Sequence, residues 1–219
     1  MGTVLAASLL IVAGCRTAAT TSRPEVDASL QEGKSRTSAV SPKQAADVQV
    51  AFGRTLERQG QDDAAMRAYQ DAVKQDPSRA DALARLGVLY DKRAKFADSA
   101  GYYDKALEAR PGDPDIFCDK GYSLYLQRKF NDAETALRQA IALRPEFPRA
   151  HNNLGLVLGH QGRRSEALAE FCKAGCNVTD AHLNLAFVMA LDGRWDEARQ
   201  QYSLVLAANP KSDAARQGL

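Results

Sequence analysis

The sequence lacks the features that most functional classes require. Lys and Arg number 29 and Asp and Glu 27 among 219 residues, so a net charge of +2 gives no strong field to attract nucleic acid. Aromatic residues make up only 7% of the chain, and there are 8 prolines. No phosphate-binding glycine loop, nucleophile elbow or pair of catalytic carboxylates occurs, so we expect no enzyme, no cofactor and no small-molecule substrate.

The apolar run at residues 1–15, MGTVLAASLLIVAGC, is shorter than the roughly 20 residues that span a bilayer. It matches the hydrophobic region of a secretory signal, and Val12-Ala13-Gly14-Cys15 resembles the bacterial lipobox. That resemblance implies a lipid on Cys15, which would anchor the chain to a membrane facing the periplasm, with the outer membrane favoured over the inner one. The basic residues that normally open such a signal are missing, so either the true start lies upstream of Met1 or the run is not a working signal. An uncleaved hydrophobic anchor is the alternative interpretation of the run.

Residues 16–45 are rich in Ser, Thr, Ala, Arg, Glu and Gln and poor in large apolar residues. Such a segment buries too little surface to offset its ordering entropy. We therefore expect a flexible tether between the anchor and a folded domain at residues 46–219.

Small residues and prolines recur with one period in that domain. Glycines stand 34 residues apart at Gly53, Gly87, Gly121 and Gly155. Small residues recur later in each unit at Ala65, Ser99, Ala133 and Ala167, and again at Ala72, Ala106, Ala140 and Ala174. Prolines close the units at Pro77, Pro111 and Pro145. This pattern resembles the tetratricopeptide repeat, a pair of helices of about 34 residues.

The resemblance implies an all-α fold, a right-handed superhelical array of about five helix-turn-helix hairpins. The units are expected at about 46–79, 80–113, 114–147, 148–178 and 179–212, the fourth being short because Ala186 takes the next small-residue position. The small residues would let helices cross closely. Bulky residues would plug the gaps between adjacent hairpins at Tyr69, Tyr103, Leu137 and Phe171.

In tetratricopeptide arrays the first helices of the hairpins line a concave groove that binds peptide segments. Carried over to this sequence, the peptide-binding residues are Arg54, Val88, Tyr122, Tyr125, Asn152, Asn153, Leu156, Asn184 and Phe187. The groove would be basic at its N-terminal end and apolar from the third unit on, with asparagines bonding the peptide backbone. Val50 and Ala84 stand where a carboxylate clamp needs lysine, which disfavours binding of C-terminal tails. The alternative is that these residues pack against another element of the chain or in a dimer.

The cysteine and histidine residues leave a redox or metal-binding function as a second possibility. Cys172 and Cys176 flank a predicted helix end and could form a disulfide or stay as buried thiols. A redox or metal-binding protein using Cys118, Cys172 and Cys176 is an unfavoured alternative, because no second set of paired ligands exists. His151 and His182 occupy equivalent places, where packing or hydrogen bonding is expected, so we predict no metal.

Signal, lipobox, tether and repeats together resemble bacterial tetratricopeptide lipoproteins. The segments at 151–163 and 184–198 are similar to the TadD lipoproteins of tight-adherence (Flp-type) pilus assembly and to type IV pilus pilotins. The resemblance implies an adaptor in the cell envelope that binds a protein or peptide partner, such as a secretin or pilus assembly component. A general envelope adaptor that recruits other proteins is the alternative.

Overall fold

A computed structural model describes residues 40–219, and the predicted signal, the lipidation site at Cys15 and the tether up to residue 39 lie outside this range. All regular structure in the described range is helical. The helices are α1 (Pro42–Arg58), α2 (Asp62–Gln75), α3 (Ala80–Asp91), α4 (Phe96–Ala109), α5 (Pro114–Leu126), α6 (Phe130–Leu143), α7 (Pro148–His160), α8 (Arg164–Lys173), α9 (Val178–Leu191), α10 (Trp195–Ala208) and α11 (Asp213–Gln217). The prediction of an all-α fold is confirmed.

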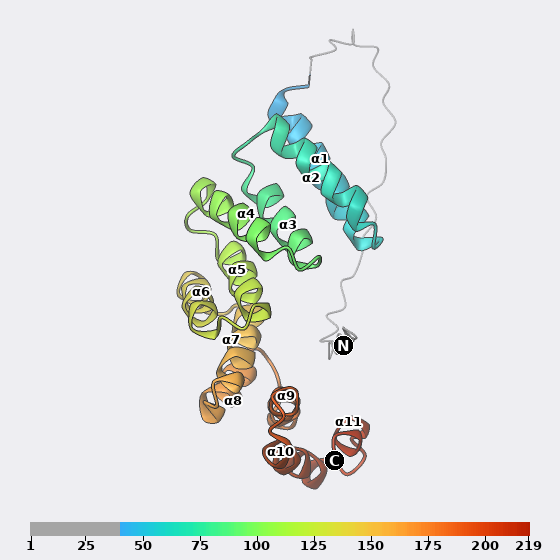
Figure 1. Ribbon diagram of the computed structural model, residues 1–219, viewed down its shortest axis with the longest axis vertical. Coiled ribbons are helices and arrows are strands. Elements are labelled where there is room, and N and C mark those ends of the chain that lie inside the picture. The colour runs from blue at the N-terminus through green and yellow to red at the C-terminus, as the bar shows by residue number, and fades with distance from the viewer. Residues whose placement is uncertain (1–39) are drawn as a thin grey trace, which may run out of the picture. The chain divides into compact units, whose positions relative to one another are not determined.

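Consecutive helices pair into five hairpins, α1 with α2 through to α9 with α10 (Figure 1). Each second helix also contacts the first helix of the next hairpin. Successive first helices contact one another from α3 to α9, so the first helices form the closely spaced layer of the array. The array therefore curves toward its first helices, and we call their outward-facing side chains the inner surface.

The repeated glycines allow the two helices of the first four hairpins to pack closely. A Cβ atom built on Gly155 would lie 2.6 Å from the ring of Phe171, and one on Gly53 would lie 2.7 Å from the ring of Tyr69. Each bulky residue thus packs over the glycine of its own hairpin. The expectation that these residues fill gaps between adjacent hairpins does not include this contact within the hairpin, although Tyr69 also shares a buried cluster with Leu86 and Leu89 of the next hairpin.

The first helix begins earlier than the predicted domain start at residue 46. Ser41 caps α1 with a capping box, since its hydroxyl accepts from the Gln44 amide and the Gln44 side chain accepts from the Ser41 amide. Pro42 stands in the first turn, where its missing N–H costs nothing. Residues 42–45, expected in the tether, are therefore helical.

The fourth hairpin departs from the regular pattern. Its second helix α8 has 10 residues, against 14 in α6 and α10. Gly175 follows it with φ of 97°, a conformation that favours glycine. The connection to the fifth hairpin, residues 174–177, is as long as the other connections between hairpins, so the missing residues are those of α8 itself. As in the preceding pairs of first helices, α7 contacts α9.

The buried core divides along the chain. One cluster runs from Cys118 in the third hairpin to Ala215 in α11, and two smaller clusters fill the first two hairpins. Within residues 40–219, no helix is long and apolar enough to cross a membrane.

Candidate functional site

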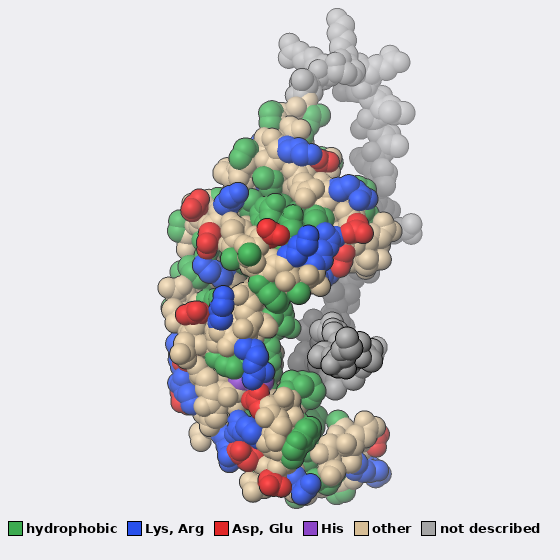
Figure 2. Space-filling model, in the orientation of Figure 1, with side chains coloured by type: hydrophobic (Ala, Val, Ile, Leu, Met, Phe, Trp, Pro, Cys, Tyr) green, Lys and Arg blue, Asp and Glu red, His purple; other side chains and the backbone are tan. Residues whose placement is uncertain are grey.

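One residue of each first helix follows the small residue directly and faces the inner surface. These residues are Arg54, Val88, Tyr122, Leu156 and Phe187. Tyr122 is 42% exposed and Phe187 is 51% exposed, whereas Val88 and Leu156 are half-buried. On the inner surface, large apolar side chains are therefore exposed mainly in the last three hairpins, and Figure 2 shows hydrophobic side chains along the hollowed edge of the domain.

Two more exposed apolar residues extend this surface. Leu126 and Leu191 each lie one helical turn beyond the preceding set and are exposed. We call Tyr122, Leu126, Leu156, Phe187 and Leu191 the apolar stripe. Leu126 and Leu191 are not among the predicted groove residues, although each lies four residues, about one helical turn, after a predicted one (Tyr122 and Phe187) and therefore on the same helix face.

The two tyrosines predicted in the groove lie together. The rings of Tyr122 and Tyr125 stack with centroids 5.7 Å apart. Tyr125 is half-buried, and burial, helped by Tyr122 and Asp192, raises its pKa to about 12. Its hydroxyl thus stays protonated and can donate a hydrogen bond at physiological pH.

The predicted asparagines have different surroundings. Asn153 is only 8% exposed, and its Nδ2 donates to Cys118 Sγ over 3.6 Å. Its side chain turns toward α5, so the expectation that its amide is free for a peptide is wrong. Asn184 Nδ2 likewise donates to Cys176 Sγ at 3.6 Å, but Asn184 is half-buried, as is Asn152. Asn152 and Asn184 therefore keep polar surface beside the apolar stripe.

The N-terminal part of the inner surface is occupied by ion pairs. Arg54 Nη2 lies 3.2 Å from Asp81, on the next first helix. Arg85 Nε donates to Glu57 at 2.9 Å, and the hydroxyl of Tyr69 donates to the same carboxylate at 2.6 Å. The basic character expected there is thus neutralised by carboxylates on neighbouring helices.

A similar pairing continues into the middle of the array. Arg149 of α7 donates to Asp119 at 2.5 Å and to Asp115 at 3.2 Å, both on α5. Burial raises the pKa of Asp119, and the charge of Arg149 opposes that shift. These pairs join the successive first helices α5 and α7.

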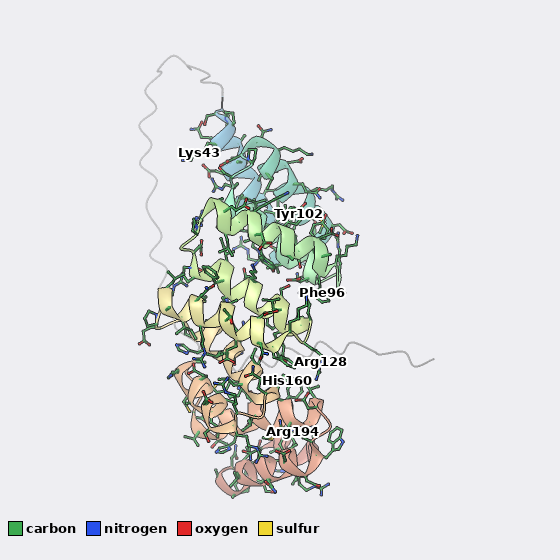
Figure 3. The ribbon with its side chains drawn as sticks, turned by 60° about the vertical axis from the view of Figure 1, so that its left-hand side comes forward. Lys43, Phe96, Tyr102, Arg128, His160 and Arg194 are labelled. Carbon is green, nitrogen blue, oxygen red and sulfur yellow. The ribbon has the colours of Figure 1, made fainter. Side chains whose placement is uncertain are left out.

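A cluster around His160 joins three hairpins (Figure 3). His160 Nδ1 lies 2.7 Å from Asp192 Oδ2, and a carboxylate only accepts, so the hydrogen is on Nδ1. Nε2 of the neutral ring then accepts from the Tyr125 hydroxyl at 3.1 Å. Phe130 stacks on the imidazole with centroids 4.9 Å apart. Burial lowers the pKa of His160, and Asp192 opposes that shift.

The same cluster spans from the third hairpin to the fifth. Arg128, in the turn after α5 with φ of 59°, places Nη2 3.2 Å from Asp192 in the turn after α9. Arg194 follows Asp192 and donates from Nη1 to the Gly159 carbonyl at 3.1 Å. These contacts join the ends of α5, α7 and α9 next to Leu126 and Leu191 of the apolar stripe, and we call Arg128, His160 and Asp192 the wall.

The cysteines and the remaining histidines take structural positions. Cys118 is buried, which raises its pKa to about 12, and Cys172 is exposed. Within residues 40–219 the cysteines form no disulfide, so the bond considered between Cys172 and Cys176 is not made. His151 Nδ1 lies 2.6 Å from Glu170 Oε2, and His182 Nδ1 lies 2.7 Å from Gln201 Oε1.

No group of three or more His, Cys, Asp or Glu side chains that could hold a metal ion occurs in the part of the chain that the structure describes. Every buried side-chain nitrogen and oxygen of that part has a hydrogen-bond partner. The polar interior is therefore internally satisfied. What the inner surface offers to a partner is therefore mainly the exposed apolar side chains of the apolar stripe.

Comparison with known families identifies the fold. Models described as "Tetratricopeptide repeat" match residues 50–114, 118–176 and 180–212. The chain belongs to the tetratricopeptide repeat family. The matched segments cover all five hairpins, in agreement with the period of the small residues.

Two longer curated proteins are similar to this chain over most of its length. The type IV pilus assembly protein PilF of Pseudomonas aeruginosa is 29% identical over 168 residues, which are 74% of this chain and 66% of that protein. The human protein O-mannosyl-transferase TMTC1 is 27% identical over 162 residues, 71% of this chain but 18% of that protein. The chain thus spans less than two thirds of each relative.

Solved structures agree on the fold. That of Pseudomonas aeruginosa pilF has a TM-score of 0.63 at 24% identity and covers 81% of this chain and 90% of that one. YrrB, described as a tetratricopeptide repeat protein with an unusual peptide-binding site, has a TM-score of 0.58 at 22% identity, with coverages of 78% and 90%. A thermophilic tetratricopeptide repeat protein of Thermus thermophilus has a TM-score of 0.60 at 23% identity, with coverages of 79% and 96%.

Proposed function

We propose that this protein is a membrane-tethered adaptor without catalytic activity. In this proposal the inner surface of the last three hairpins holds a segment of a pilus or secretion assembly component. The lipid on Cys15 would keep the repeat domain at the membrane of the cell envelope, facing the periplasm. The observation that carries the proposal is the apolar stripe, because exposed apolar surface of this extent is typical of a binding site.

The energetics favour a partner with apolar side chains. Burying a large apolar side chain contributes about 1.5–3 kcal/mol, so covering Tyr122 and Phe187 would raise the affinity severalfold or more for each. Asn152 and Asn184 supply amide groups that can bond a peptide backbone beside the stripe. The ion pairs of the first two hairpins offer no comparable gain, since a partner would have to displace existing carboxylates.

The wall formed by Arg128, His160 and Asp192 limits how a partner can enter. It closes the edge of the stripe on the side of the turns, where Arg128 and Asp192 are in contact. A bound segment would therefore lie along the stripe, across successive first helices. Support for a role in pilus assembly comes from the similarity to PilF, and the name given to YrrB indicates that a tetratricopeptide fold of this kind can carry a peptide-binding site.

The binding site can be tested by charge substitution. Tyr122→Glu and Phe187→Glu should reduce co-purification of secretin and pilus assembly proteins at least tenfold, because a carboxylate in an apolar contact would be desolvated. Leu143→Glu is the matched control, since Leu143 is similarly exposed but lies on the second helix α6. Equal recovery of these proteins with all three variants would contradict the proposal. Recovery of other envelope proteins that depends on the stripe would favour the general adaptor instead.

The anchor needs a separate test. Cells supplied with labelled palmitate should incorporate it into the wild-type chain and not into Cys15→Ala. Fractionation of the envelope would then show which membrane holds the protein. Label that persists in Cys15→Ala would overturn the lipidation proposal and leave the binding proposal intact.

A further inference from the structure

Two positions of each first helix normally face the preceding hairpin. They lie one and five residues before the small residue of the repeat. In the later hairpins the apolar residues at these positions are almost fully buried: Ala82, Leu86, Ile116, Ala150, Leu154, Ala181 and Leu185. The exception, Lys120, bonds Asp104 on the second helix of the preceding hairpin at 2.8 Å. Both positions thus belong to the interface between hairpins.

The first hairpin presents the same positions without a neighbour among the described residues. They are occupied by Val48, which is 63% exposed, and Phe52, which is 55% exposed. Exposed Gln44 and Ala51 lie on the same face of α1, at helical spacing from Val48 and Phe52, and the exposed C-cap residue Gln59 follows at the end of this face. We call these five residues the end face. It carries no charged side chain, although terminal repeats usually need a polar outer surface.

The opposite end of the array is covered differently. The short helix α11 packs on α10, and its Ala215 is fully buried. Ser212 caps α11 by accepting from the Ala215 amide. An end covered in this way does not expose the second-helix surface on which a following first helix would pack. Stacking of one copy's first hairpin on another copy's last hairpin is therefore obstructed.

We infer that two copies of this chain associate through their end faces, α1 against α1. In a two-fold dimer both partners contribute the same face, so that face must be self-complementary in shape and charge. The uncharged end face, with Val48 and Phe52 at its centre, does so without like-charge repulsion at that centre. The exposed charged residues that flank it, Lys43, Asp47 and Arg58, remain at the rim, where Arg58 donates to the hydroxyl of Thr55. The contact would continue the helix-on-helix packing that already joins the five hairpins.

The pairing is expected to be weak. One face of a single helix buries less than the roughly 800 Å² per partner of a standard stable interface. A dissociation constant in the micromolar range or above follows, so the dimer would form mainly where the chain is concentrated. This inference concerns α1 and does not depend on the apolar stripe or on the proposed binding of a peptide.

Sedimentation of the full chain in a non-ionic detergent tests the association. The wild-type chain should show a monomer–dimer equilibrium, and Phe52→Glu should raise the dissociation constant at least tenfold. Leu204→Glu, at an exposed apolar position of α10, is the control and should leave the equilibrium unchanged. Circular dichroism would verify that Phe52→Glu stays folded. A wild-type chain that is monomeric at all concentrations, or a dimer insensitive to Phe52→Glu, would overturn the inference.

Cross-linking distinguishes the arrangement. In a Cys172→Ser background, Phe52→Cys should form a disulfide between two copies under mild oxidation, because a two-fold axis near Phe52 brings identical residues together. Leu204→Cys should not. Two results would refute a two-fold α1 pairing: a mixed disulfide between Phe52→Cys and Leu204→Cys chains, or a Phe52→Cys chain that stays reduced.

Discussion

At the position that follows the small residue of the first helix, the first hairpin carries Arg54 and the fifth carries Phe187. Arg54 is paired with Asp81 on the next first helix, whereas half of the Phe187 side chain is open to solvent. The same repeat position therefore carries an ion pair between hairpins in the first hairpin and an exposed apolar side chain in the fifth. The backbone geometry is the same, so the type of side chain decides between the two roles.

The buried residue that covers the glycine also differs between the first and the fourth hairpin, being polar in the first and apolar in the fourth. In the first hairpin the ring over the glycine is Tyr69, whose hydroxyl donates to Glu57, and Glu57 also accepts from Arg85. In the fourth hairpin the ring is Phe171, which is fully buried and has no polar group. The group that covers the glycine thus also bonds across to the second hairpin at the start of the array, whereas in the fourth hairpin it contributes packing alone. That difference leads to predictions for each end.

Removing the ring in the fourth hairpin should have the largest effect. Phe171→Ala leaves a cavity over Gly155 in the larger core cluster, which should lower the free energy of unfolding by about 3–5 kcal/mol. Equilibrium unfolding in urea measures this loss. A change of less than about 1 kcal/mol would mean that the hairpins close over the gap, and that packing is not what holds the fourth hairpin.

Breaking the polar junction of the first two hairpins should cost less. Glu57→Ala removes the acceptor for Tyr69 and Arg85, and we expect a loss of about 1–3 kcal/mol because Arg85 remains partly solvated. Asp63→Ala is the control, since Asp63 is highly exposed and its pair with Arg93 should contribute about 0.5 kcal/mol or less. Equal losses in the two variants would show that the junction adds no stability beyond a surface ion pair.

A fall in pH should destabilise the fourth and fifth hairpins more than the first two, since all described histidines lie in the fourth and fifth hairpins. Burial lowers the pKa of His160 below its ordinary value of about 6.5, so the unfolded chain binds its proton first as the pH falls. The contribution of His160 is therefore complete above that value and decreases as the pH drops toward the lowered pKa. The groups facing the ring are Asp192, Arg128, Arg194 and Tyr125.

Amide hydrogen exchange at pH 7 and at about pH 5.5, below the ordinary histidine pKa, measures this difference. After correction for the intrinsic pH dependence of exchange, protection of α7 and α9 should fall more than that of α1 and α3. His160→Gln should remove most of the additional loss. Uniform loss along the whole array, unchanged in His160→Gln, would attribute the pH dependence to groups other than this cluster.

Substitutions on the apolar stripe should affect folding least. Phe187→Glu changes an exposed residue, so the free energy of unfolding should stay within about 0.5 kcal/mol of the wild type. Thermal unfolding followed by circular dichroism would measure it. A loss above about 2 kcal/mol would indicate that Phe187 supports the fold, and the stripe would then be a packing surface.

Much of the fold could be predicted because small residues at a fixed period leave few alternatives. Gly53, Gly87, Gly121 and Gly155 indicate where helices cross, and the early break at Gly175 indicates the short fourth hairpin. The start of α1 escapes a prediction based on composition, although Ser41 and Pro42 are both favoured at helix starts.

The candidate site was harder to predict than the fold. The exposed Tyr122 and Phe187 follow from helical periodicity, since each sits beside the small residue of its repeat. The burial of Asn153 against Cys118 and the pairing of Arg54 with Asp81 depend on contacts between hairpins, which spacing within one hairpin does not specify. The contact of Arg128 with Asp192 joins residues 64 apart, from the third hairpin to the fifth, and the spacing within one repeat does not specify it either.

The central claim is that the inner surface of the last three hairpins binds the partner and that of the first two does not. Placing a photo-reactive benzoylphenylalanine at Phe187 and, in a separate chain, at Arg54 tests it in intact cells. We predict that irradiation joins the Phe187 chain to a pilus or secretion assembly component and yields no such adduct from the Arg54 chain. Adducts with that component from Arg54 alone, or equally from both positions, would contradict the account.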